Sequence, residues 1–396
     1  MHTVRNFEIP TVMKHGLGAI NALADELRDL GVKRPLIVTD PGIVKAGLLE
    51  RATRPLDIAK MDYVIFDQIV PNPPTVLVDE GAAYYASEGC DGLVGLGGGS
   101  ALDTAKAIGV IASNGGQILD YEWADPQPIK HRIPPLVCIP TTAGTGSEVT
   151  LWAVITDPER KIKFNVGGTA LIGAWVALLD PELTLGLPPA VTAGTGMDAL
   201  AHAIECYTCA YAQPISDSVA LLAIEYVARY LRVTFAQGHN LEARYKMSQA
   251  AMLGGLAYGK ESAGAAHAMS QSAGGVLPNV PHGPFTARLL GPVMEYNFKG
   301  EPEKFARIAL AMGEDIRGLS LWQAAEKAVE AVLRLTDDVE IPHIQSFGFT
   351  EEQIPMLARI AFEDPQTIGN PRDLSVASYE KIYRRVFEMG KKKDRD

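Results

Sequence analysis

The sequence has few cysteines, no long apolar run and no excess of basic residues. Four cysteines in 396 residues are too few for a disulfide framework. No apolar segment approaches the roughly 18–20 residues that cross a bilayer. The first residues, MHTVRNFEIP, lack the basic and then apolar regions of a secretory signal. These absences predict a protein of the reducing cytoplasm that has no membrane partner.

The charge balance is acidic, with 47 Asp and Glu against 36 Lys and Arg and a net charge of -11. Nucleic-acid partners need Lys and Arg to meet their phosphates, so none is expected. The basic run Lys391–Lys393 is interpreted as a solvated tail. Because 396 residues exceed what one hydrophobic core usually supports, two domains are predicted.

Cys206 and Cys209 form a C-x-x-C pair, which in other proteins can serve redox or metal chemistry. Both lie in an Ala-rich helical stretch, and no second C-x-x-C exists to complete a zinc site. A structural role within the helix is therefore the better interpretation.

The first half of the chain alternates short apolar strands with helical segments, which indicates a parallel sheet covered on both faces. Strands are predicted at 35–39, 62–66, 93–96, 135–139 and 176–179, and a hairpin at 151–156 and 161–166. After Asp180-Pro181 the chain is Ala- and Leu-rich with a 3.6-residue period, which predicts helices only. We therefore expect an α/β domain at 1–184 and an all-α domain at 185–396, with a ligand cleft between them.

A glycine-rich loop follows the predicted strand 93–96 and opens a helix at 101–111. Gly97, Gly98, Gly99 and Ser100 allow close approach of the backbone, and the helix start offers N–H groups and partial positive charge to a pyrophosphate. Asp103 and Lys106 lie on the first helical turns. The usual G-x-G-x-x-G pattern is absent, and such loops also serve tight packing, so nucleotide binding and packing both stay open here.

A second loop, Pro140–Glu148, follows the next strand and offers the hydroxyls of Thr141, Thr142, Thr145 and Ser147. These could bind a carboxamide, ribose or phosphate, or could bond within the turn itself. Asp40 follows the predicted strand 35–39. Its carboxylate could accept hydrogen bonds from ribose hydroxyls, or could cap the N-terminus of the segment that follows. Ligands of open α/β sheets bind where such strand ends meet.

Four side chains suggest a metal site. Asp198 and His202 are four residues apart and share one helix face, His267 lies in an apolar helical stretch, and His282 precedes a helix. Three imidazoles and a carboxylate suit Fe²⁺ or Zn²⁺. Spacing does not show that these segments meet, and a single buried histidine is more often an ordinary core residue.

Together these segments resemble the iron-containing (group III) alcohol dehydrogenase family over nearly the whole chain. The matching segments are 71–73, 97–106, 140–149, 196–205, 267–269, 281–283 and 367–372. The resemblance implies a nucleotide-binding α/β domain followed by a helical metal-binding domain. It also implies NAD as cofactor, Fe²⁺ before Zn²⁺ as metal, and a homo-oligomer, with a dimer favoured.

The resemblance also assigns residues. It implies that Asp198, His202, His267 and His282 bind the metal. It places at the cofactor Asp40, Asn72, Gly97, Gly98, Gly99, Ser100, Asp103, Thr141, Thr142, Thr145 and, near the ribose, Lys163. No catalytic residue beyond the metal centre is assigned.

The substrate pocket is expected to depart from the family. Gln271 stands where members commonly carry a second histidine that is proposed to relay a proton. Trp152, Tyr258, Lys260 and Gln366 stand at positions that line the substrate in relatives. Bulky rings there predict short substrates of two to four carbons, and Lys260 could pair with an anion. The alternatives are that Trp152 packs between hairpin and sheet and that Lys260 faces water.

The predicted reaction is hydride transfer between NAD(H) and a small primary alcohol, diol or aldehyde. A metal-dependent lyase of the dehydroquinate synthase type is the rival enzyme class. Such lyases need many basic residues for a phosphorylated acid, and residues 250–290 contain only Lys260 and Arg288. A non-catalytic nucleotide-binding scaffold is the third hypothesis, and the complete ligand set disfavours it.

Overall fold

The computed structural model describes residues 5–123, 127–259, 263–277 and 280–393. The chain divides into two compact units, which are described one at a time. Asn6–Thr142 and Gly146–Gly186 form the α/β unit, and Leu187–Asp396 with the short segment Ala143–Thr145 belong to the helical unit.

Six parallel strands form the sheet of the α/β unit, in the order β1-β8-β5-β4-β2-β3. These strands are β1 (Val12–His15), β2 (Pro35–Val38), β3 (Val64–Phe66), β4 (Gly92–Gly97), β5 (Leu136–Pro140) and β8 (Val176–Leu179). The antiparallel pair β6 (Trp152–Asp157) and β7 (Ile162–Gly167) forms a separate hairpin. The predicted parallel sheet is confirmed, but the edge strand β1 was not predicted because most of its residues are exposed.

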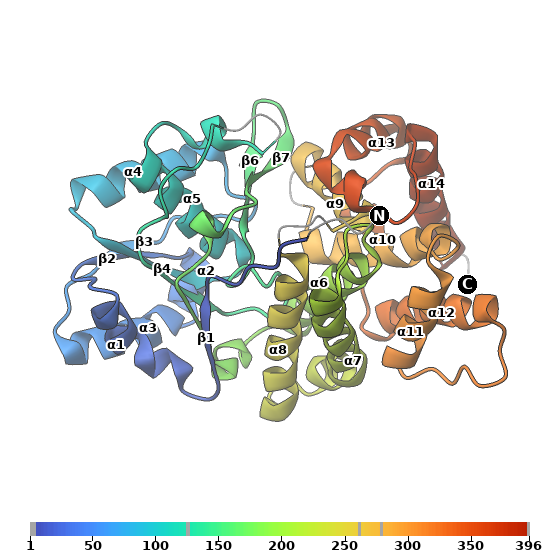
Figure 1. Cartoon of the computed structure of the whole chain (residues 1–396), viewed down its shortest axis with the longest axis horizontal. Coiled ribbons are helices and arrows are strands. Elements are labelled where there is room, and N and C mark those ends of the chain that lie inside the picture. The colour runs from blue at the N-terminus through green and yellow to red at the C-terminus, as the bar shows by residue number, and fades with distance from the viewer. Residues whose placement is uncertain (1–4, 124–126, 260–262, 278–279, 394–396) are drawn as a thin grey trace. The chain divides into compact units, whose positions relative to one another are not determined.

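Helices cover both faces of this sheet, as Figure 1 shows. They are α1 (Leu23–Asp29), α2 (Pro41–Lys45), α3 (Leu48–Ala59), α4 (Thr75–Ser87) and α5 (Gly99–Asn114). Side chains alternate along each strand, so Leu36 and Val38 pack in the core that α4 and α5 complete. Ile37 points to the opposite face, in the core that includes residues of α1 and α3. Both faces are apolar, which explains the continuous apolar runs in the sequence.

A buried charged cluster ties α5 to the residues before and within β6. The Lys106 ammonium is fully buried and donates to the carbonyls of Thr150 (2.9 Å) and Trp152 (2.8 Å) and to the Thr150 hydroxyl (3.0 Å). Burial lowers the pKa of Lys106 and raises the pKa of Glu148 to about 7. The backbone that follows the second loop, at Thr150 and Trp152, is therefore held by one lysine side chain.

The helical unit consists of successive helices, and its described residues contain no strand. Its helices are α6 (Pro189–Thr208), α7 (Pro214–Ala236), α8 (Leu241–Tyr258), α9 (Ala265–Val276), α10 (His282–Asn297), α11 (Pro302–Ala311), α12 (Leu321–Asp338), α13 (Ile354–Glu363) and α14 (Val376–Lys393). Most residues of α6 are buried, and Gly196 lets α7 approach, since a Cβ there would lie 2.3 Å from Leu231. Gly254 on α8 likewise lies close to the Ala199 carbonyl of α6. Small residues thus place α6 in the centre of the unit.

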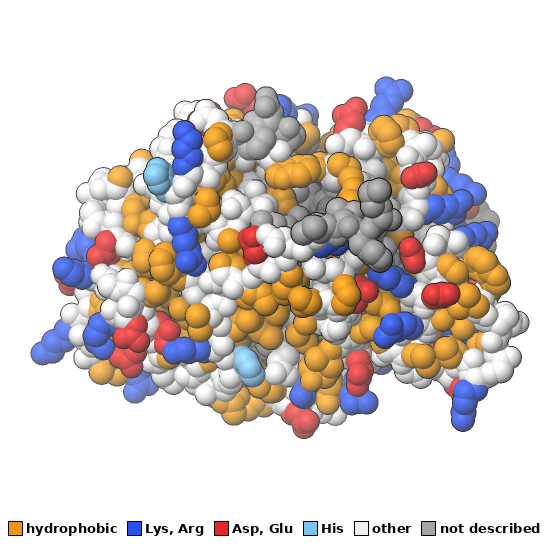
Figure 2. All heavy atoms as spheres, in the orientation of Figure 1, with side chains coloured by type: hydrophobic (Ala, Val, Ile, Leu, Met, Phe, Trp, Pro, Cys, Tyr) orange, Lys and Arg blue, Asp and Glu red, His pale blue; other side chains and the backbone are white. Residues whose placement is uncertain are grey.

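The surface carries charges of both signs. On the face shown in Figure 2, basic and acidic side chains are interspersed with apolar ones. Among the described residues, no helix has both the length and the apolar character needed to span a membrane. All four cysteines lie in the described part of the chain, and none forms a disulfide.

Candidate functional site

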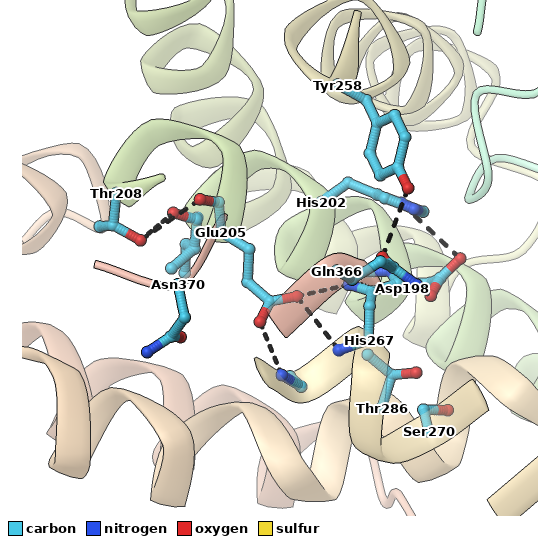
Figure 3. A network of polar contacts seen from close by, with 12 residues as sticks. Asp198, His202, Glu205, Thr208, Tyr258, His267, Ser270, Thr286, Gln366 and Asn370 are labelled. Carbon is cyan, nitrogen blue, oxygen red and sulfur yellow. Dashed lines mark hydrogen bonds and ion pairs between the residues drawn. The ribbon is translucent and has the colours of Figure 1, made fainter. Parts of the chain in front are cut away.

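The four predicted metal ligands come together in the helical unit. Asp198 and His202 lie on α6, His267 on α9, and His282 is the first residue of α10. The Asp198 Oδ1 atom is 3.5 Å from His282 Nε2 and 3.8 Å from His267 Nε2, and Asp198 Oδ2 is 3.9 Å from His202 Nδ1. Figure 3 shows Asp198, His202 and His267 facing one another. The tertiary structure therefore joins segments whose meeting their spacing alone did not show.

The geometry of this cluster fits a divalent cation. Ligand atoms of Asp198, His267 and His282 all lie within 4.8 Å of one another. Bonds of about 2.0–2.2 Å to a tetrahedral ion would place ligand atoms roughly 3.3–3.6 Å apart. Asp198 Oδ1, His202 Nδ1 and His267 Nε2 are buried and accept or donate no hydrogen bond among the described residues. Buried polar atoms without a hydrogen bond are rare in folded proteins. A cation held by Asp198, His267 and His282 would satisfy the Asp198 and His267 atoms, and His202 lies beside this group, with its Nδ1 3.9 Å from Asp198 Oδ2.

The protonation of His202 also suits a ligand. Burial, reinforced by the neighbouring His267, lowers the pKa of His202 to about 3. Its imidazole is therefore neutral near pH 7, which is the form that binds metals. The ring centroids of His202 and His267 are 4.2 Å apart, so the two imidazoles are packed against each other.

Glu205 is a site residue that the sequence interpretation missed. It lies on α6, seven residues after Asp198, and its carboxylate accepts from His267 Nδ1 at 2.5 Å and from the Ala266 amide at 2.7 Å. Burial alone would lower the pKa of His267, but the hydrogen bond and charge of Glu205 outweigh it and raise that pKa. The available signal was the spacing 198, 202, 205, which places three polar residues on one face of an apolar helix.

Two predicted pocket residues meet next to the histidines. The Tyr258 ring lies edge-on to His202, with centroids 5.8 Å apart, and its hydroxyl donates to Gln366 Oε1 at 3.3 Å. Both side chains are buried. Gln366 belongs to a short 3-10 helix, Pro365–Gly369, which the Asp364 carboxylate caps.

The other predicted pocket residues are placed as follows. Gln271 lies on α9 one turn after His267, buried, and its Oε1 has no hydrogen-bond partner among the described residues. Lys260 lies outside the described residues. Trp152 begins β6 in the α/β unit and packs edge-on against Trp123, with ring centroids 6.0 Å apart. Its contact with substrate stays a prediction.

Three predicted cofactor segments lie together at the carboxyl ends of the neighbouring strands β5, β4 and β2. The Thr141 amide donates to the Gly97 carbonyl at 2.9 Å. A Cβ on Gly97 would lie 3.4 Å from Asp40 Oδ2, and one on Gly98 would lie 3.5 Å from Thr142. Helix α5 begins at Gly99 without a side-chain cap, so its first N–H groups remain available to an anion.

Asp40 caps the N-terminus of α2, which was the alternative to ribose binding predicted for this residue. Its Oδ1 accepts from the amides of Gly42 (2.8 Å) and Ile43 (3.0 Å), at the start of α2. Its other oxygen, Oδ2, is the atom next to Gly97. Capping and ribose binding are therefore compatible, because they use different oxygens.

The remaining cofactor candidates are more varied. Asn72 has a left-handed backbone (φ 55°), which non-glycine residues rarely adopt outside special sites. Asp103 and Ser147 hydrogen-bond to each other, and Asp103 also accepts from the Val154 amide, so both are part of the framework around Lys106. Ser100 lies in the first turn of α5, Lys163 lies on β7 opposite Thr156, and Thr145 lies in the segment that belongs to the helical unit.

Comparisons with known proteins agree with this architecture. The family model "Iron-containing alcohol dehydrogenase" matches residues 10–181, and "Fe-containing alcohol dehydrogenase family, C-terminal" matches residues 192–387. The chain belongs to the iron-containing alcohol dehydrogenase family. It is thus an oxidoreductase of small alcohols and aldehydes, which decides against the lyase and the non-catalytic scaffold.

Relatives within this family differ in substrate. Choline dehydrogenase of Bacillus subtilis (strain 168) is 56% identical over 98% of this chain and 96% of its own. The crystal structure of a 1,3-propanediol oxidoreductase has a TM-score of 0.93 at 39% identity, covering 97% of this chain and 100% of that one. Sulfoacetaldehyde reductase from Bifidobacterium kashiwanohense, in complex with NAD⁺, has a TM-score of 0.86 at 29% identity, covering 97% and 99%.

Proposed function

We propose that this family member is an NAD- and metal-dependent dehydrogenase of a small primary alcohol, and that its substrate is choline. The metal is Fe²⁺, with Zn²⁺ as the alternative, and the protein acts as a cytoplasmic homodimer, as the family resemblance implies. The observation that carries the proposal is the cluster of Asp198, His202, His267 and His282. Buried atoms of Asp198, His202 and His267 in it have no hydrogen bond among the described residues.

Each part of the site would then have a task. Asp198 and the three imidazoles would hold the ion, which when bound supplies a Lewis acid that lowers the pKa of an alcohol hydroxyl. The N-terminus of α5 would take the cofactor pyrophosphate, and Asp40 Oδ2 would accept from a ribose hydroxyl. Gln271 has no titratable group, so it would orient the substrate but would not relay the proton.

Two observations favour choline. One is the sequence identity to the Bacillus subtilis choline dehydrogenase, and the other is the aromatic and acidic side chains that lie beside the histidines. Choline is a two-carbon alcohol that carries a trimethylammonium group, and proteins bind such groups with aromatic rings and carboxylates. Tyr258 offers a buried ring next to His202. Burial raises the pKa of Asp364 to about 7, and its charge also influences His267 and Tyr258, which places this carboxyl in the same neighbourhood.

We expect a matched panel of short alcohols to show this preference. Choline, 1,3-propanediol and 2-hydroxyethanesulfonate are similar in size but are cationic, neutral and anionic. With NAD, kcat/KM measured by NADH absorbance should be highest for choline. Replacing Tyr258 by Leu should lower the ratio of kcat/KM for choline to kcat/KM for 1,3-propanediol by about 2- to 30-fold, since cation–π contacts are worth about 0.5–2 kcal/mol. Tyr258→Phe, which keeps the ring, is the matched control.

Two outcomes of this panel would contradict the choline assignment. A preference for the sulfonate would indicate a basic recognition group, as considered for Lys260. A preference for the diol would make the protein a 1,3-propanediol dehydrogenase in activity. Neither outcome would affect the assignment of the metal ligands.

Cofactor choice is expected to depend on the charge of Asp40. A 2′-phosphate 4 Å from this carboxylate would cost about 1 kcal/mol in water and about 4 kcal/mol at an effective dielectric of 20. We therefore expect a preference for NAD over NADP of roughly tenfold or more. Asp40→Asn keeps the capping oxygen and removes the charge, so it should narrow the preference in steady-state kinetics. Equal use of NADPH and NADH by the wild type would contradict this role.

A further inference from the structure

We propose that Glu205 is a positioning residue for the metal, which fixes the ring and tautomer of His267 so that Nε2 faces the ion. The inference rests on the metal centre of the proposed function, but it concerns a residue outside the ligand set. Figure 3 shows the Glu205 carboxylate on the side of His267 away from Asp198.

The contact is short and shielded from water. His267 Nδ1–H donates to Glu205 Oε2 at 2.5 Å, and both side chains are almost completely buried. Because a carboxylate can only accept, this bond places the proton on Nδ1 and leaves the lone pair on Nε2. The Nε2 atom lies 3.8 Å from Asp198 Oδ1 and has no other partner among the described residues. The ring is therefore held with its metal-binding nitrogen toward the cluster.

The carboxylate is itself fixed by the backbone. Its Oε1 accepts from the Ala266 amide at 2.7 Å, and its Oε2 also lies 3.3 Å from the His267 amide. These amides belong to the first turn of α9, whose N-terminus favours a negative charge. Glu205 thus orients His267 with respect to α6, the helix that also carries Asp198 and His202.

Gly264 supplies independent support. Its backbone is extended (φ −177°), so no conformational need requires glycine there. A Cβ at this position would lie 2.8 Å from Glu205 Oε1 and 3.2 Å from its carboxyl carbon. The absent side chain therefore gives the carboxylate its room beside the start of α9.

A weaker version of the same arrangement holds a second ligand. The Ser270 hydroxyl lies 3.1 Å from His282 Nδ1 and 3.3 Å from the His282 carbonyl, which leaves His282 Nε2 toward Asp198. Because a hydrogen bond to a charged group is stronger than one between neutral groups, Glu205 should matter more than Ser270.

The test measures metal affinity directly. Apo protein of the wild type and of Glu205→Gln, Gly264→Ala and Ser272→Ala is titrated with Zn²⁺ against a chromophoric chelator, with circular dichroism to confirm the fold. Gln has one acceptor oxygen and would turn an NH₂ group toward a backbone N–H donor, so Glu205→Gln should weaken Zn²⁺ binding by about 10- to 100-fold. Gly264→Ala, which displaces the carboxylate without removing it, should weaken binding in the same direction.

Ser272→Ala is the matched control, since among the described residues this buried hydroxyl on α9 bonds only to the Ala268 carbonyl. The Zn²⁺ affinity of this variant should equal that of the wild type. A folded Glu205→Gln protein with wild-type Zn²⁺ affinity would overturn the inference. If Glu205→Gln does not fold, Gly264→Ala decides in the same way. If the wild type itself binds no Zn²⁺, or binds it equally well after His267→Ala, the proposed metal centre fails instead.

Discussion

Replacement of His267 by Ala is expected to abolish turnover while NADH binding is retained. The substitution removes one of four groups that converge on a buried point and leaves the loops after β2, β4 and β5 untouched. A Lewis acid contributes several kcal/mol to stabilising developing charge, so the loss in kcat/KM should be on the order of a thousandfold. Initial rates and NADH fluorescence titrations on the same preparation measure the two quantities separately.

Chelation provides the second arm of this experiment. Removal of the metal from the wild type should abolish activity, and Fe²⁺ or Zn²⁺ should restore part of it. His267→Ala should not recover under the same treatment, whereas Ser272→Ala should behave as the wild type. Full activity in a verified metal-free preparation would refute the metal centre.

Replacement of Lys106 by Ala is expected to destabilise the α/β unit by about 3–5 kcal/mol, the usual effect of removing one partner from a buried charged cluster. The substitution leaves the Thr150 and Trp152 carbonyls without their donor. It also removes the cation that offsets the burial of Asp103 and Glu148, whose pKa values burial raises. Urea denaturation measures the free energy of unfolding, followed by tryptophan fluorescence, since three of the four tryptophans (Trp123, Trp152 and Trp175) lie in this unit.

The exposed Lys33 is the matched control for this variant, because Lys33→Ala should change stability by no more than about 0.5 kcal/mol. A loss below 1 kcal/mol in Lys106→Ala would show that water or a rearranged backbone replaces the ammonium. In that case the backbone that follows the second loop would not depend on Lys106 for its conformation.

The sequence predicted the buried elements of the fold better than the exposed ones. Strands β2, β5 and β8 are apolar throughout because both of their faces are covered, and they were predicted nearly to their ends. Strand β1 is exposed along most of its length. Its last residues, Lys14 and His15, are polar, so the segment lacks the apolar run by which the other strands were predicted. Its pairing with β8 depends on a segment more than 160 residues away, which local pattern does not reveal.

The same limit applies to the site. The candidate metal ligands were predicted from residue types and resemblance, and histidine and aspartate side chains stand out in an apolar helical background. Glu205 was missed because its partner, His267, is 62 residues away, and a glutamate on a helix is ordinary until that contact is seen. The capping role of Asp40 was easier to predict, because its hydrogen bonds go to amides only two and three residues away and because Pro41 is typical of the first position of a helix.

The position of Asp198, His202 and Glu205 on the single helix α6 has a consequence for how the protein acquires its metal. The conformational entropy of ordering these three groups is offset by the packing of α6 within its unit, whether or not an ion is present. Small metallodomains differ, because there the ion itself holds the core together. For the proposed metal centre we therefore expect folding to come first and metal loading to follow, so that the supply of ions would set the active fraction without changing the amount of folded enzyme.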